Sequence, residues 1–167
     1  APLTGACYIM AMDTARVAGA PTNFGDLLAW AKANPGRFTD VAPPQVDGSR
    51  FLLTALYGLT GGYEQYAGAE FDEALWNEKS PLVWEYLKEI EPYLWREGST
   101  YPPTQSRLQE LFANGEIWMM PAFTARIVEG MATEQLPNTI QAFALPGISL
   151  NDPSFTAIPI NARNPAG

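Results

Sequence analysis

The sequence predicts a mixed α/β fold in which a mostly parallel sheet carries helices on both faces. Apolar segments of strand length alternate with longer segments whose apolar residues recur at helical spacing. Strands separated by helices are typical of a layered α/β domain. Apolar residues make up 47% of the 167 residues and charged residues only 17%, so we expect a packed core and not a disordered chain.

Five short apolar segments have the length and the flanking turn residues of strands. After one of them we expect the chain to turn at Pro121–Ala122, because proline has no N–H to donate to a sheet ladder. A loop rich in Pro, Gly, Asn and Ser, at Pro146–Ser154, precedes the last one. The expected strands are Ala6–Met12, Arg37–Ala42, Ile117–Met120, Thr139–Leu145 and Phe155–Ile160.

Start signals precede the apolar stripes of the expected helices. Asn23, with an acidic residue three positions later, approximates a capping box, and Thr104 is a second side chain suited to an N-cap. Ser80–Pro81 has the order of cap and proline that favours a helix start. We expect two further helices to begin at Asp47–Ser49 and directly after Pro121–Ala122.

The charge and the residue types exclude several functions. The net charge is −8, from 18 acidic and 10 basic residues with no basic run, which disfavours nucleic acid and anionic membranes as partners. The chain has no histidine and one cysteine, which excludes His-based triads and His-ligated metals. We therefore expect no catalytic residue, metal or cofactor. A cationic ligand would suit the charge, although solubility alone explains most acidic surfaces.

The first candidate ligand contacts are Asp47, Gly48 and Ser49. At a helix start their free backbone N–H groups suit an anion or a carboxylate, and glycine lets a ligand come close to the backbone. The alternative is that Asp47 or Ser49 simply caps the helix, and the two roles are compatible. Asp47 is also able to pair with a cation.

The other candidate contacts are Ala122, Phe123, Thr124 and Tyr101. The first three lie where a strand gives way to a helix, at the edge where ligands bind in open α/β sheets. Phe123 either stacks on a ligand or packs into the core, and Thr124 has capping as its alternative role. Tyr101, beside two prolines, either projects into a cleft or covers an apolar edge.

Several of these segments together resemble the large two-lobed periplasmic solute-binding proteins of ABC importers, the class with maltose-, spermidine-, iron- and thiamine-binding members. The similarity covers nearly the whole chain. The segment ANGEIWMM carries the family's moderately specific F-x-x-G-E-x-x-M pattern. The similar segments are Pro21–Phe38, Pro43–Gly62, Pro92–Pro102, Leu111–Phe123 and Phe155–Gly167.

The resemblance implies one lobe of the periplasmic binding protein type II fold. Residues 1–150 correspond to the second lobe, and residues 151–167 to the crossover and a strand returning toward the absent first lobe. The expected function is non-catalytic capture of a small solute in an inter-lobe cleft, in the periplasm, for delivery to an ABC permease. The turn at Ala122–Thr124 faces that cleft in the family. Because a single lobe exposes its inter-lobe face, we also expect the fragment to self-associate.

Two other functions stay open from the sequence. One is a carboxylate-based hydrolase, since glycosidases work with two carboxylates, although the acidic residues here lie in solvated segments. The other is the ligand-sensing extracellular module of a receptor.

Overall fold

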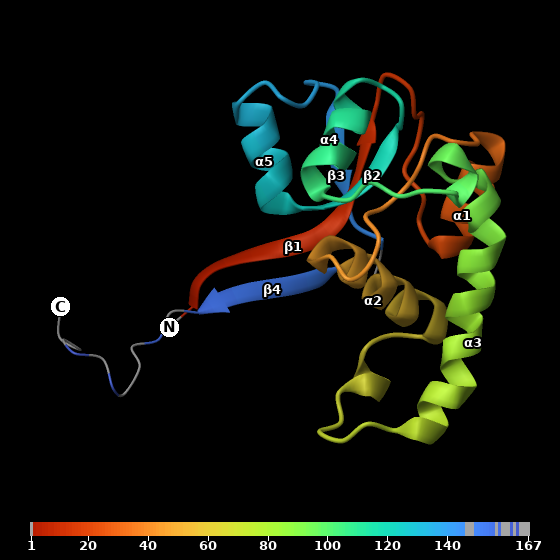
Figure 1. Cartoon of the computed structure of the whole chain (residues 1–167), viewed down its shortest axis with the longest axis vertical. Coiled ribbons are helices and arrows are strands. Elements are labelled where there is room, and N and C mark those ends of the chain that lie inside the picture. Colours follow the sequence, from red (N-terminus) through yellow and green to blue (C-terminus); the bar gives the residue numbers. More distant parts are fainter. Residues whose placement is uncertain (1, 146–148, 156, 158–160, 162, 164–167) are drawn as a thin grey trace.

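The computed structural model describes residues 2–145, 149–155, 157, 161 and 163 (Figure 1). Four α-helices, with three short 3-10 turns among them, separate β1 from the other described strands, so helices and strands do not strictly alternate. The elements are β1 (Pro2–Asp13), α1 (Phe24–Ala33), α2 (Val46–Thr60), η1 (Glu64–Tyr66), α3 (Glu73–Ile90), η2 (Glu91–Tyr93), η3 (Trp95–Gly98), α4 (Gln105–Ala113), β2 (Met119–Phe123), α5 (Thr124–Ala132), β3 (Ile140–Phe143) and β4 (Leu150–Phe155).

The sheet is built around β1, and it is antiparallel. The first half of β1 pairs with β4, and its second half lies between β2 and β3. All three pairings are antiparallel, so the expected mostly parallel sheet is wrong. The reason is the place of β1. The strands β2 and β3, joined through α5, run in the same direction, but β1 runs between them in the opposite one.

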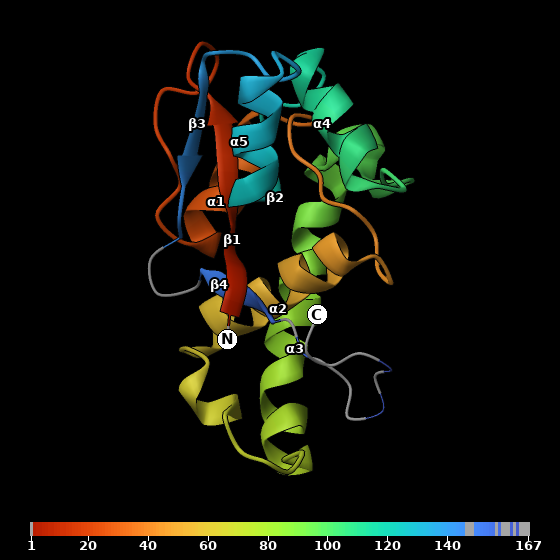
Figure 2. The ribbon, with the colours of Figure 1, turned by 90° about the vertical axis from the view of Figure 1, so that its left-hand side faces the viewer.

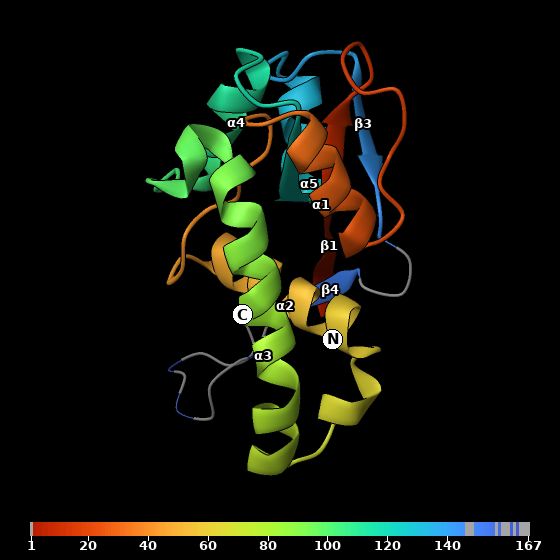
Figure 3. The same cartoon turned by 90° about the vertical axis from the view of Figure 1, so that its right-hand side faces the viewer.

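Helices cover both faces of this sheet, as the sequence predicts. Alternate residues of β1 enter two separate cores, because successive strand side chains point to opposite faces. Tyr8, Met10 and Met12 pack with buried residues of α1, α2 and α3. Ala11 instead packs with buried residues of α4 and α5. Figure 2 shows α5 in front of the sheet, and Figure 3 shows α1 and α3 over the opposite face.

Three helix starts have side-chain caps, and two of them confirm the sequence prediction. The Asn23 side chain accepts a hydrogen bond from the first turn of α1 at 2.9 Å, and Thr104 does the same for α4 at 3.2 Å. The expected start at Ser80–Pro81 is wrong, since both residues lie inside α3. This helix begins earlier, where Asp72 accepts from the N–H of Leu75 at 2.9 Å.

The strand predictions need three corrections. Arg37–Ala42 is not a strand and makes a single parallel bridge, from Phe38 to β2. The chain does not turn at Pro121–Ala122, because β2 continues through both residues. Proline is tolerated there because β2 ends the strand order β2-β1-β3 and does not need a second full ladder. The expected loop at Pro146–Ser154 contains most of β4, while the expected strand Phe155–Ile160 lies largely outside the described residues.

Candidate functional site

The candidate contacts from the two halves of the chain lie side by side, joined by Tyr8. The hydroxyl of Tyr8 donates to the backbone oxygen of Asp47 at 2.7 Å, in the first turn of α2. Its ring meets that of Phe123 edge to face, with centroids 5.1 Å apart, and the two residues are register partners in the sheet. Tyr8 therefore holds the start of α2 against the junction of β2 and α5.

Both helices that start here begin without a side-chain cap. The N-cap residues are Gln45 for α2 and Phe123 for α5, and neither side chain accepts a hydrogen bond from its helix. The first N–H groups of a helix have no acceptor within the helix, and they carry the positive end of its dipole. The N-cap of α2 is Gln45 and not Asp47 or Ser49, although the Asp47 carboxyl group interacts with its own backbone N–H in the first turn. At both starts the N-cap side chain leaves the first N–H groups to other acceptors.

Gly48 is required by the protein's own packing. A Cβ on this residue would lie 2.1 Å from the carbonyl oxygen of Val41 and 2.8 Å from the nitrogen of Pro43. The segment before α2 therefore passes directly over the helix where a side chain would be. The space beside the Cα of Gly48 is already filled and the residue is buried, so the expected open approach of a ligand to its backbone is absent.

The charge of Asp47 is only partly compensated. The residue is half-buried, and burial raises the pKa of its carboxyl group, while the positive charge of Arg126 on α5 acts in the opposite direction. Arg126 itself is exposed and pairs with Glu129 at 3.1 Å. The side chain of Ser49 is exposed and lines a different cavity, of about 230 Å³, together with Trp76 and Trp84. The two helix starts thus combine a carboxyl group with a guanidinium group, and Ser49 lies apart from them.

The three residues at the end of β2 have different environments. Ala122 is fully buried in the core formed with α4 and α5. Phe123 is half-buried and packs against the other core, beside Tyr8, so it contributes to the core and keeps part of its ring accessible. The hydroxyl oxygen of Thr124 accepts a hydrogen bond from the backbone N–H of Cys7 at 3.2 Å. Thr124 therefore ties α5 to β1 and does not cap its own helix.

Tyr101 lines a separate cavity of about 480 Å³, which also contains Asp40, Pro43 and Trp84. Burial raises the pKa of Tyr101 to about 12, and the charges of Asp40 and Glu91 add to this effect. Tyr101 thus both packs against the core and faces a cavity. The structure does not place Tyr101 against Gly48 or Phe123. Asp40 connects the two regions, because it lines the cavity of Tyr101 and its charge also acts on Tyr8.

Asp40 and Tyr8 are the two residues of this region that the sequence analysis missed. Asp40 is buried, with 6% of its surface exposed, and burial raises its pKa from 3.8 to about 7. Burial also raises the pKa of Tyr8 well above its usual value, and the charges of Asp40 and Asp47 add to it. Two features of the sequence point to these residues: Asp40 is an acid in an otherwise apolar segment, and Tyr8 is a tyrosine in an expected buried strand.

Among the described residues, no group of three or more His, Cys, Asp or Glu side chains is placed to hold a metal ion. In the same part of the chain, no helix is both long and apolar enough to cross a membrane.

Comparison with known proteins defines the class to which this fold and site belong. The sequence profile of the bacterial extracellular solute-binding proteins matches residues 1–167. The chain therefore belongs to this family, and the resemblance found in the sequence is confirmed.

Individual relatives show how much of a whole protein this chain represents. It is 34% identical over 138 residues to Protein YnjB of Escherichia coli K12, covering 82% of this chain but 35% of YnjB. The spermidine/putrescine ABC transporter substrate-binding protein PotD of Streptococcus pneumoniae has a similar fold (TM-score 0.61, 12% identity, 90% of this chain and 39% of that one). So does RafE of Streptococcus pneumoniae (TM-score 0.60, 19% identity, 98% and 47%). The chain thus spans less than half the length of each.

Proposed function

We propose that this chain forms one wall of a cleft that captures a small solute outside the cytoplasm for an ABC importer, without catalysis. Family membership supports solute capture, and the relatives include substrate-binding proteins of ABC transporters. In the proposal, residues 1–150 are the second lobe, and residues 151–167 lead toward a first lobe. The partners are the solute and, through the intact two-lobed protein, the ABC permease.

The observation that supports a site here is the pair of uncapped helix starts. The first turns of α2 and α5 are both linked to Tyr8, and at neither start does the N-cap side chain accept a hydrogen bond from a first-turn N–H. Two helix N-termini that converge favour a carboxylate, phosphate or carbonyl oxygen of a solute. The proposed contacts at these helix starts are Asp47, Phe123 and Thr124, and further proposed contacts are Ser49 and Tyr101 in the cavities that they line. Gly48 and Ala122 are buried, so in the proposal they support these positions.

The aromatic side chains of the region suggest how a solute would be oriented. The accessible part of Phe123 offers a ring face near the helix starts, where an apolar or ring-shaped part of a solute can stack for about 0.5–2 kcal/mol. Asp47 and Arg126 lie close enough for their charges to interact, and together they can distinguish solutes by charge. The proposed solute therefore has a polar group for the N–H donors and an apolar part for the ring.

The test uses the complete protein from its natural reading frame. Native mass spectrometry of the purified protein identifies any solute that it retains, and calorimetry measures the affinity. We expect Phe123→Leu to weaken binding about five- to tenfold, since it removes the ring but keeps an apolar side chain. Phe71→Leu, at the far end of α2, is the matched control. Equal affinities of the wild type and Phe123→Leu would contradict the proposed site.

The isolated chain should bind the same solute weakly, because one lobe offers only part of the contacts that two closing lobes provide. Sub-micromolar binding by the isolated chain would contradict the two-lobe proposal. We also propose that the isolated chain self-associates through its uncovered face. Size-exclusion chromatography with light scattering across a dilution series measures this, and a monomer at all concentrations would contradict it.

A further inference from the structure

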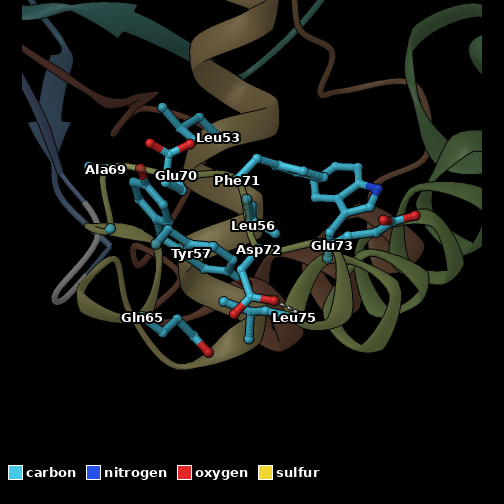
Figure 4. A pocket seen from close by; sticks show the side chains of 13 residues that line it. Leu53, Leu56, Tyr57, Gln65, Ala69, Glu70, Phe71, Asp72, Glu73 and Leu75 are labelled. Atoms are coloured by element: carbon cyan, nitrogen blue, oxygen red, sulfur yellow. Dashed lines mark hydrogen bonds between the residues drawn. The ribbon is translucent and has the colours of Figure 1, made fainter.

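A second cavity lies at the other end of α2, away from the candidate solute site. Its volume is about 750 Å³. Side chains from the second half of α2, from the connection at residues 65–72 and from the start of α3 surround it (Figure 4). Asp47 and Tyr57 are ten residues apart on α2, so the two sites are separated by about 15 Å along the helix axis.

Four aromatic rings line this second cavity in two pairs. The ring centroids of Tyr57 and Tyr66 are 5.7 Å apart, and those of Phe71 and Trp76 are 6.2 Å apart. Phe71 is 74% exposed and Trp76 is 37% exposed, in both cases beside the hollow. Leaving a phenylalanine this open forgoes about 1.5–3 kcal/mol of burial, and such exposed apolar surface is typical of a binding site.

The charged side chains of the cavity are all acidic. Its lining contains Glu70, Asp72 and Glu73, and no lysine or arginine. Asp72 is occupied as the N-cap of α3, where its charge also offsets the helix dipole. Within the described part of the chain, Glu70 and Glu73 form no ion pair. Lys79 lies near Tyr66 and is paired with Glu78 at 2.8 Å, and this pairing is the main cause that raises its pKa.

We propose that this cavity binds a compact organic cation of the alkylammonium type. A cation over the faces of aromatic rings is attracted by their negative electrostatic potential, at about 0.5–2 kcal/mol for each ring. Methyl groups on the nitrogen make the ion apolar enough to contact Leu53 and Leu56 at the cavity floor. Glu70 and Glu73 supply the opposite charge at its mouth. Neither a neutral apolar molecule nor an anion uses both features.

The test compares choline with 3,3-dimethylbutan-1-ol, which has the same shape but a carbon in place of the charged nitrogen. Each compound is titrated into the chain while amide and indole N–H signals are followed by NMR. We expect choline to shift the signals of Tyr57, Tyr66, Phe71 and Trp76, and we expect at least about tenfold weaker binding of the alcohol. Equal affinities, or no shift at these residues with choline, would overturn the proposal.

Two substitutions separate the aromatic contribution from the acidic one. Phe71→Leu keeps an apolar side chain without the ring, and Glu70→Gln keeps the shape without the charge. Because both residues are exposed, neither change disturbs the core. We expect each to weaken choline binding about three- to tenfold. Phe123→Leu, in the proposed solute site, should leave the affinity for choline unchanged. If Phe123→Leu weakened choline binding while Phe71→Leu and Glu70→Gln did not, choline would bind at the solute site and the proposal would be overturned.

Discussion

The α-helices of the described chain begin in two different ways. α1, α3 and α4 each have a side chain that accepts a hydrogen bond from the first turn: Asn23, Asp72 and Thr104. α2 and α5 have none, and these are the two helices whose starts meet around Tyr8. The capped starts satisfy their own backbone and serve the scaffold. In the proposed function, the uncapped starts supply donors to a solute.

The surroundings of the capped and the uncapped helix starts also differ. The three capping residues are exposed, so their polar atoms remain hydrated. Near the uncapped starts, Asp40 is buried with a raised pKa, and Gly48 is pressed against the backbone of residues 41–43. The buried carboxyl group of Asp40 therefore lowers the stability of the lobe when it ionises, whereas the packing around Gly48 depends on the absence of a side chain. The following changes test both features.

The largest expected effect comes from Asp40→Asn. The folded protein keeps Asp40 protonated up to about pH 7, whereas the unfolded chain ionises it near 3.8. Between these values the folded state binds more protons, so the free energy of unfolding falls as pH rises and then levels off above about pH 7. The amide variant has no such decline. We expect it to be more stable than the wild type at pH 8 by up to about 4 kcal/mol.

Urea unfolding of both proteins at pH 4 and pH 8 measures this difference. The advantage of Asp40→Asn at pH 8 should fall to about 0.5 kcal/mol at pH 4, where Asp40 is protonated in the folded wild type and close to half protonated in the unfolded chain. An advantage of the same size at both pH values would show that the substitution acts through packing and not through the charge.

Gly48→Ala is expected to destabilise the lobe by about 3 kcal/mol. The new Cβ would meet backbone atoms of residues 41–43, which cannot move away as a flexible side chain could. The control is Gly19→Ala, at an exposed position where a Cβ meets no atom within 4 Å. Thermal unfolding compares the two. A Gly48→Ala protein as stable as the control would mean that the segment before α2 does not pack as described.

Tyr8→Phe should cost about 1.5 kcal/mol, because it removes the donor for the backbone oxygen of Asp47 and keeps the ring against Phe123. It should also loosen the start of α2. Hydrogen exchange detects this as faster exchange in the first turns of α2, with α1 unchanged as an internal reference. Exchange that accelerates equally in both helices would argue against a local role for Tyr8.

The smallest effects concern the caps themselves. Thr104→Ala and Asn23→Ala should each cost about 1 kcal/mol, since each removes an acceptor for a first-turn N–H. Gln45→Ala, at the N-cap of α2, should change the free energy of unfolding by less than about 0.5 kcal/mol, because this side chain makes no such bond. If Gln45→Ala lowered the free energy of unfolding as much as Thr104→Ala does, the capped and uncapped helix starts would not differ in this respect.

Local signals were enough to predict much of the fold. Asn23 and Thr104 cap helices as expected, since a cap depends on residues three positions away. The direction of the strands could not be predicted in this way, because it depends on β1 lying between two strands more than a hundred residues later. Pro121 was taken as the end of a strand, and only its place on the edge of the strand order explains why it is tolerated inside β2.

For the candidate site, the sequence indicated the backbone positions better than the side chains. Helix starts at Asp47–Ser49 and after Phe123 are local features, and the structure places them together. Tyr8 was not predicted, since its hydrogen-bond partner is 39 residues away in the chain. The raised pKa of Asp40 likewise arises from burial by distant elements, which no spacing in its own segment indicates.

The most direct test of the account follows the backbone N–H groups at the five helix starts when the complete protein binds the solute that it retains. Amide NMR shifts and exchange protection report each start separately. We predict that the first turns of α2 and α5 respond, while those of α1, α3 and α4, which already have acceptors, do not. A response at the capped starts, with α2 and α5 unchanged, would contradict the proposal that the uncapped pair binds the solute.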